Sequence, residues 1–327
     1  MNTRPAYVSV TDPIGSAIDR TRTILFRPFD LGKWFVIGLS AWLAQLGSSG
    51  SGGGNGGPRG RGTYRSEDVP NEMRQFFSEA RHFVETNLHW IIPVVIIVSL
   101  FMVFLWLLMV WLSSRARFSF LYCVAQNKGE FWIPWRQYAN HGGSLCGFRI
   151  VVGLLSFVVV MTFLVLGGVL AYFSVESIGF NFLSISGIVM CGLLFIASMI
   201  IFGVISVFTT DFVVPIMVRT NLKCTRAWRV LIELISDNMG RFIVYLLFKI
   251  VIGLAIGMIV IGLGCITCGC ACCCAAIPYL GAVVFLPLTV FMRSYSLCYL
   301  AQYGDDFDVI VPEPEPESAL PAGEPQA

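Results

Sequence analysis

Charge is the property that this sequence has least of. Only 13% of its 327 residues are Asp, Glu, Lys or Arg, whereas 56% are hydrophobic. A soluble domain carries about 25% charged residues, so this chain has too little charge to cover a surface that faces water. The shortage excludes an ordinary soluble globular protein and predicts that lipid is the solvent for much of the chain.

Patches of one charge sign are also lacking. The formal net charge is +2, and no stripe of basic residues interleaved with aromatic ones occurs. The arginines stand at the ends of apolar runs, where membrane topology rather than nucleic acid places them. We therefore expect the lipid bilayer as the main partner and no nucleic acid.

Catalytic motifs are the third absence. The sequence contains no Gly-x-Ser-x-Gly, no His-Glu-x-x-His and no Gly-x-x-x-x-Gly-Lys, which would indicate a hydrolase, a zinc peptidase or a nucleotide-binding loop. The glycine run at 50–57 lacks the lysine and the flanking strand and helix that hold phosphates. We expect neither an enzyme nor a bound cofactor.

Long apolar runs are what the sequence does have. A bilayer core of about 30 Å takes about 20 apolar helical residues to cross. Six runs meet or approach that length, so the predicted fold is an all-α integral membrane domain over 31–302 with six transmembrane helices. The predicted spans are 31–47, 90–112, 148–173, 182–208, 242–264 and 277–300. The first is short enough to be re-entrant, and the last contains Pro278, Pro287 and Arg293.

Loop charge predicts the orientation. Residues 1–30 hold four arginines without an apolar core or a cleavage site, so we expect no cleavable signal peptide and a cytoplasmic segment with an amphipathic helix after Asp12-Pro13. The loops after the second and fourth spans are rich in Lys and Arg, whereas those after the third and fifth have neither. The positive-inside rule then places both termini in the cytoplasm.

Two segments are predicted to lie outside the membrane without a folded core. The Gly-rich stretch 48–62 is typical of a flexible linker, on the outside in this topology. The acidic, Pro-rich stretch 303–327 is typical of a disordered cytoplasmic tail. Such a tail could bind a protein partner.

An internal repeat relates parts of the membrane domain. Trp135-Arg136 recurs as Trp228-Arg229, and the glycine and isoleucine that follow them recur at the same offset, 93 residues on. We interpret the chain as three helical-hairpin units, each introduced by a helix on the cytoplasmic surface. The alternative is that membrane helices resemble one another through composition alone.

The exits of the even-numbered spans carry charge at equivalent points, namely Arg117, Asp211 and Arg293. An ionisable side chain in the hydrocarbon costs several kcal/mol unless it is paired or wet, so these residues are the candidate functional cluster. We hypothesise that Asp211 pairs with Arg293 first and Arg117 second. The alternative is that Arg117 reaches the lipid headgroups while Asp211 caps the next helix.

Six cysteines are crowded between the fifth and sixth spans. They are Cys265, Cys268, Cys270, Cys272, Cys273 and Cys274. Their spacing lacks the two separated Cys-x-x-Cys pairs of zinc sites, and basic residues that would favour thiolates are distant. Packing as small apolar side chains is the favoured interpretation, and we expect no metal. Disulfides on an oxidising outer face and metal binding are the alternatives.

One stretch resembles known proteins. Asp211-Phe-Val-Val-Pro-Ile-Met-Val, followed by Ala227-Trp228-Arg229 and a span, resembles a group of uncharacterised bacterial membrane proteins. It is also distantly similar to the membrane domain of some glycerophosphodiester phosphodiesterases. The similarity covers about 110–302 and includes no phosphodiesterase domain, so that activity does not transfer. The resemblance implies a multi-pass protein of unknown role in a bacterial cytoplasmic (inner) membrane.

Two functions remain. The favoured one is a non-enzymatic membrane or envelope component. The alternative is a small-molecule or lipid transporter whose path passes Arg117, Asp211 and Arg293. Interrupted helices near the membrane centre favour transport, and the sequence offers few of them. Convergence of the three charged residues on a cavity would favour the transporter.

Overall fold

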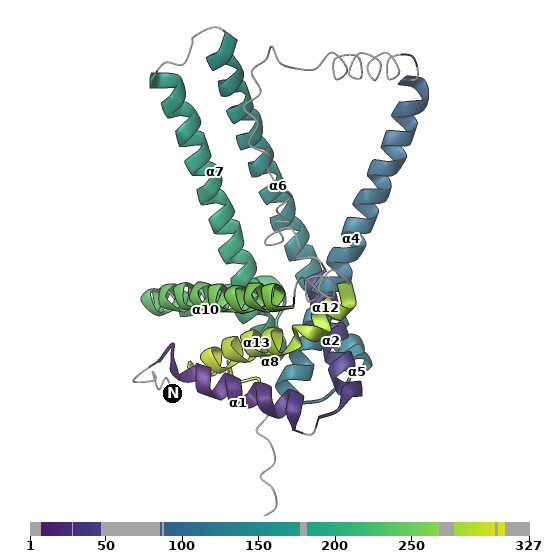
Figure 1. Ribbon diagram of the computed structural model, residues 1–327, viewed down its shortest axis with the longest axis vertical. Helices are drawn as coiled ribbons and strands as arrows, with labels where there is room; N and C mark the ends of the chain where they lie inside the picture. The colour runs from purple at the N-terminus through teal and green to yellow at the C-terminus, as the bar shows by residue number, and fades with distance from the viewer. Residues whose placement is uncertain are drawn as a thin grey trace, which may run out of the picture.

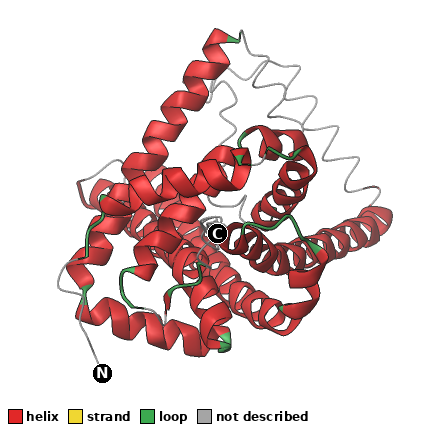
Figure 2. Ribbon diagram, turned by 90° about the horizontal axis from the view of Figure 1, so that it is seen from below, coloured by secondary structure: helices red, strands yellow, loops and turns green. Residues whose placement is uncertain are grey.

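The computed structural model describes residues 8–27, 29–46, 86, 88–176, 182–267, 278–304 and 307–310. Within these ranges every regular element is helical (Figure 2). The elements are α1 (Asp12–Phe26), α2 (Leu31–Gln45), α4 (Leu88–Gln126), α5 (Trp132–Gln137), α6 (Ala139–Glu176), α7 (Phe182–Phe208), the π-helix η1 (Thr209–Val213), α8 (Val214–Thr220), α9 (Cys224–Asp237), α10 (Met239–Ile266), α12 (Pro278–Val284) and α13 (Leu286–Ala301). The predicted linker at 48–62 lies outside the described residues, as does the predicted tail 303–327 beyond residue 310. At the start of that tail, the prediction of a disordered segment is wrong, because Tyr303, Phe307 and Ile310 pack against the buried core.

The molecule has three long arms on a base of shorter helices (Figure 1). The arms are α4, α6 and α7; α6 packs against α7, and α4 crosses α6 near the base. In the base, α1 packs along α13, and α2 is held between α4 and α12. Helix α10 runs across the foot of the arms (Figure 1).

Four described helices are long and apolar enough to cross a membrane, which indicates a membrane protein. They are His89–Gln126, Ala139–Tyr172, Ser186–Thr220 and Met239–Gly262. These helices cover most of the second to fifth predicted spans. Each forms because a chain in lipid must satisfy its backbone hydrogen bonds within the segment.

The first and last predicted spans have a different form. Helix α2 has 15 residues, and at 1.5 Å per residue it reaches about 22 Å, short of a bilayer core. The last run is divided at Phe285 into α12 and α13. Pro287 stands in the first turn of α13, where a residue without an N–H is tolerated, whereas inside a continuous helix it would remove a hydrogen bond. Six spans therefore stay a prediction.

Polar contacts tie the N-terminal segment to the base. The Arg20 guanidinium donates to the carbonyls of Val124 at 3.0 Å and Ala125 at 2.6 Å, in the last turn of α4. A cation at a helix C-terminus meets the negative end of the helix dipole. At the end of α13, the Gln302 amide accepts from the Ser9 N–H at 2.9 Å and donates to the Ser9 carbonyl at 3.0 Å. These bonds fix α1 beneath the helices that carry the charged cluster.

One glycine allows two long helices to cross closely. A Cβ on Gly142 of α6 would lie 2.7 Å from Cγ of Arg115 on α4, which is closer than real Cβ atoms approach. The neighbouring Gly143 has nothing within 4 Å of that position. Gly142 therefore sets the distance between α4 and α6 at the base.

Candidate functional site: a buried charge cluster beside a cavity

The candidate site begins at an irregularity where α7 ends. Helix α7 continues into the π-helix η1 and then α8, and the Val214 N–H donates to the Thr209 carbonyl, five residues back. Pro215 follows in the first turn of α8. A proline lacks the N–H that would bond the carbonyl four residues back, here that of Asp211, and its ring crowds that carbonyl. The helix widens at this point, and such π-bulges are frequent at functional sites.

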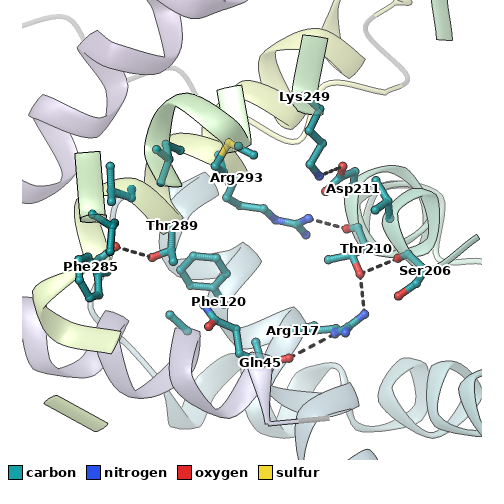
Figure 3. A pocket seen from close by; sticks show the side chains of 18 residues that line it. Gln45, Arg117, Phe120, Ser206, Thr210, Asp211, Lys249, Phe285, Thr289 and Arg293 are labelled. Carbon is teal, nitrogen blue, oxygen red and sulfur yellow. Dashed lines mark hydrogen bonds and ion pairs between the residues drawn. The ribbon is translucent and has the colours of Figure 1, made fainter. Parts of the chain in front are cut away.

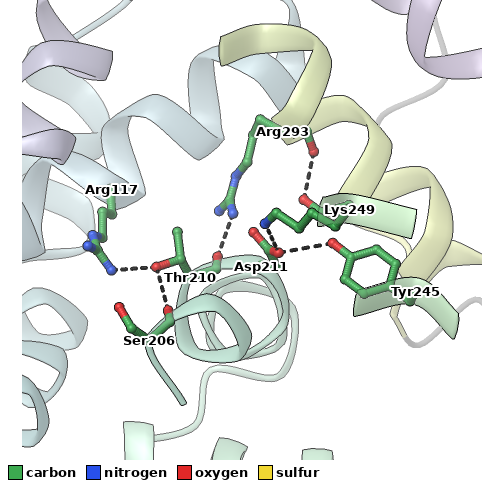
Figure 4. Close-up of polar contacts among 8 residues, drawn as sticks. Arg117, Ser206, Thr210, Asp211, Tyr245, Lys249 and Arg293 are labelled. Atoms are coloured by element: carbon green, nitrogen blue, oxygen red, sulfur yellow. Dashed lines mark hydrogen bonds and ion pairs between the residues drawn. The ribbon is translucent and has the colours of Figure 1, made fainter. Parts of the chain in front are cut away.

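Asp211 lies inside this widened turn and is 5% exposed. Its carboxylate accepts a hydrogen bond from the Tyr245 hydroxyl at 2.9 Å and forms an ion pair with the Lys249 ammonium (Figure 4). Both partners lie on α10, one turn apart, so they present their polar groups on the same face. The carboxylate is thus held by α10.

Two arginines approach the same turn from other helices (Figure 4). Arg117 of α4 donates to the Thr210 hydroxyl at 2.6 Å and, through Nε, to the Ala44 carbonyl at 3.5 Å. Arg293 of α13 donates to the Thr210 carbonyl. The two arginines are 5% and 6% exposed. Thr210 and Asp211 therefore join α4, α10 and α13 around the bulge.

The structure brings the three predicted charged residues together, but the predicted ion pair is wrong in its partner. Within the described chain, Asp211 pairs with Lys249 and not with Arg293. Its side chain makes no cap at the start of α8 either. The π-bulge turns the carboxylate toward α10, and Lys249 reaches it there. Lys249 is the single charged residue of the run 242–264, and that isolation was the signal that could have found it.

A cavity of about 600 Å³ opens beside the cluster (Figure 3). Its lining comes from α2, α4, α7, η1, α10, α13 and the residue between α12 and α13. The polar lining residues are Gln45, Arg117, Ser206, Thr210, Asp211, Lys249, Thr289 and Arg293. The apolar ones are Ala41, Ala44, Phe120, Val207, Gly253, Ile256, Val260, Phe285, Leu288 and Met292. All three predicted charged residues line this cavity.

Neither of the repeated Trp-Arg pairs lines the cavity. Trp135 is half-buried against Phe131, with ring centroids 5.2 Å apart, and Trp228 is half-buried against Phe148 at 5.7 Å. The adjoining Arg136 and Arg229 are exposed. Tryptophan packs against an aromatic ring and arginine is exposed in both places, and their location at the membrane surface stays a prediction.

Five of the six clustered cysteines lie outside the described residues. The sixth, Cys265, is described and is exposed. In the described part of the chain no three His, Cys, Asp or Glu side chains are grouped as metal ligands. Elsewhere, Cys123 and Cys224 are fully buried, and burial raises the pKa of the Cys224 thiol to about 12. These two cysteines pack as apolar side chains.

Fold and site together define an all-helical membrane protein with a buried charge cluster beside a cavity. Residues 8–281 match a family of unknown function (DUF7544), and the chain belongs to that family. The match agrees with the expected uncharacterised family, but it shows no link to glycerophosphodiester phosphodiesterases. No curated protein and no solved structure matches the chain.

Proposed function

We propose that this protein binds a small molecule or a lipid in the cavity beside Asp211 and carries it without chemical change. The observation that supports this is the convergence of Arg117, Asp211 and Arg293, from three separate helices, on one cavity of about 600 Å³. That volume lies within the usual range of ligand sites. The geometry thus favours the second of the two functions expected from the sequence.

Burial cost supports a binding role for the cluster. A buried ion carries a desolvation penalty of several kcal/mol even after relaxation. The lining holds three cations, Arg117, Lys249 and Arg293, against the single carboxylate of Asp211. A purely structural bundle with apolar residues at these positions would be about as stable, so stability alone does not account for the cations. A ligand that bound these cations in the open volume would offset their desolvation penalty, which gives a physical reason for their presence.

The lining residues also support a carrier rather than an enzyme. Asp211 already accepts from Tyr245 and Lys249, and the lining contains no histidine or cysteine. General acid-base catalysis needs a pair of groups that exchange protons with the substrate. We therefore propose a non-enzymatic role.

The proposed setting is a bacterial inner membrane, with six spans in three units and both termini in the cytoplasm. The helix ends support the three units. Arg117 and Asp211 are followed, at the same distance along the chain, by Asn127 and Asn221, which end α4 and α8 with φ of 55° and 54°. Arg293 is followed by the end of α13 and by Gly304, with φ of 134°. Asn and Gly are the residues that adopt positive φ most readily. Binding of a protein partner by the acidic tail stays a prediction.

The experiment fills the cavity from α10. Gly253 lines the cavity, and a Cβ there would meet nothing within 4 Å. Gly253→Leu should place a side chain in the open volume without a clash. Gly262 also has nothing within 4 Å and lies on the opposite side of the helix at 3.6 residues per turn, so Gly262→Leu is the matched control.

Native mass spectrometry of the full chain, purified in mild detergent, should show a co-purified molecule on the wild type and on Gly262→Leu. The same adduct should be absent from Gly253→Leu. A wild type without any adduct, or equal occupancy in the two leucine variants, would contradict the proposed function.

A further inference from the structure

The geometry points to the chemical class of the ligand: an amphiphile with an anionic phosphate head and an apolar tail. This inference rests on the proposed function and deepens it. The head would lie among Arg117, Lys249 and Arg293. The tail would lie along the apolar walls that α10 and α13 give to the same cavity.

The charge balance of the lining favours an anion. The Asp211 carboxylate offsets one of the three cations, through its ion pair with Lys249. Two positive charges then remain among the lining residues, both on arginines that are about 95% buried. A phosphate group carries between one and two negative charges at neutral pH. A phosphate would offset the two positive charges that Asp211 leaves uncompensated.

The hydrogen-bond donors of the arginines favour a phosphate in particular. A guanidinium has five N–H donors in a planar fork that fits two phosphate oxygens at once. Within the described chain, Arg293 donates only to the Thr210 carbonyl, and its buried Nε has no partner. Arg117 donates to Thr210 and Ala44. Both forks therefore retain donors for a ligand with several acceptor oxygens.

The walls of the cavity separate charge from apolar surface. On α10, Lys249 is followed on the lining face by Gly253, Ile256 and Val260, about 16 Å further along at 1.5 Å per residue. On α13, the lining residues before Arg293 are Met292, Thr289 and Leu288, with Phe285 beyond them. Figure 3 shows Phe285 on one side of the cavity and Arg117, Asp211 and Lys249 on the other.

This division argues against two simpler ligands. A free phosphate ion would occupy only the charged end and leave the walls of α10 and α13 without a partner. An uncharged lipid would fill the apolar end and leave the two arginines uncompensated. A phosphate-bearing lipid satisfies both ends of the cavity at once, because burial of apolar surface and charge-assisted hydrogen bonds then act together.

The test uses the full chain, delipidated in detergent, and four probes. They are dioleoyl phosphatidic acid, dioleoylglycerol with the same tails and no phosphate, dioleoyl phosphatidylcholine with a compensated phosphate, and inorganic phosphate. We expect phosphatidic acid to bind about tenfold or more tighter than dioleoylglycerol, as hydrogen bonds to charged groups warrant. The affinity for phosphatidylcholine should lie between these two, and inorganic phosphate should bind most weakly.

Variants that should change the affinity in opposite directions sharpen the test. Arg293→Gln should weaken the binding of phosphatidic acid about tenfold and leave that of dioleoylglycerol unchanged. Arg293→Lys should recover only part of the affinity, because lysine keeps the charge but lacks the planar fork. Asp211→Asn should increase the affinity for phosphatidic acid, because it removes the one negative charge near the head. Its amide oxygen can still accept the hydrogen bond from Tyr245. Arg229→Gln, at an exposed arginine outside the cavity, is the matched control and should change nothing.

The outcomes separate this inference from the proposed function. Equal affinity for phosphatidic acid and dioleoylglycerol, with both weakened by Gly253→Leu, would overturn the phosphate head and leave the cavity a binding site. Inorganic phosphate binding as tightly as phosphatidic acid would overturn the apolar tail. An unchanged affinity in Arg293→Gln would remove Arg293 from the site. Absence of binding by every probe, together with no co-purified molecule, would overturn both proposals.

Discussion

The two halves of α4 lie in opposite environments. In the upper half, Ile97 is 65% exposed and Leu100 is 64% exposed. In the lower half, Ser113 and Ser119 are fully buried, and Arg117 is 5% exposed. Apolar side chains therefore face outward along the arm, whereas the base buries polar side chains together with apolar ones such as Phe118 and Leu121. The exposed apolar arm is the part that differs from a water-soluble protein.

The difference shows how the base is held together. Apolar contact between helices gains little in lipid, because lipid tails are as apolar as leucine. Close packing and polar bonds between helices then decide together which helices meet. Ser113 donates to the Ala44 carbonyl of α2 at 2.8 Å, and Arg149 of α6 donates to the hydroxyls of Ser113 and Ser114 at 3.1 and 3.2 Å. Along the arms, the Cys191 thiol of α7 donates to the Phe163 carbonyl of α6 at 3.5 Å, and most of the side chains there are the exposed apolar ones that lipid requires.

The largest expected effect breaks the charged part of the base. Asp211→Leu should lower the free energy of unfolding by about 3–5 kcal/mol, because it leaves Lys249 without its partner in a mostly buried site. Adding Lys249→Met should recover most of the loss. Unfolding in mixed detergent micelles, followed by circular dichroism, measures both changes. A double variant no more stable than Asp211→Leu would show that the ion pair does not hold the base.

An intermediate effect compares the two halves of α4 directly. Leu121→Ala should cost about 2–3 kcal/mol, because Leu121 is 1% exposed and its loss leaves a cavity in the base. Leu100→Ala, on the exposed arm, should change the free energy of unfolding by less than about 0.5 kcal/mol. The same micellar unfolding assay applies to both. Equal losses would mean that the arm is packed against protein rather than lipid.

The smallest effect concerns the crossing of α4 and α6. Gly142→Ala should destabilise the chain by about 1–2 kcal/mol, because its Cβ would contact Arg115 at 2.7 Å and force the helices apart. Gly143→Ala, with open space around it, should be neutral or stabilise by up to about 1 kcal/mol through helix propensity. Thermal unfolding of the two variants side by side gives the comparison. If the unfolding temperature fell by the same amount in both variants, the close crossing at Gly142 would be contradicted.

Much of the candidate site could be predicted without coordinates, because charge in an apolar run is conspicuous. Arg117, Asp211 and Arg293 stand at matching exits, and the repeat alone predicted that they share one level of the molecule. The partner of Asp211 could not be predicted in this way. Lys249 lies in a different apolar run, and no spacing rule says which helix the widened turn at Asp211 will face.

The amino-acid sequence by itself determined the helical membrane character of this protein, because about 20 apolar residues in lipid have no stable alternative to a helix. It also determined which charged residues stand within apolar runs or at their ends. Only the tertiary structure decided that Asp211 pairs with α10, that the last apolar run divides at Phe285, and that the cluster adjoins a cavity. These features depend on which faces of distant helices meet, and that is set by packing and polar bonds between helices rather than by the local pattern of any one of them.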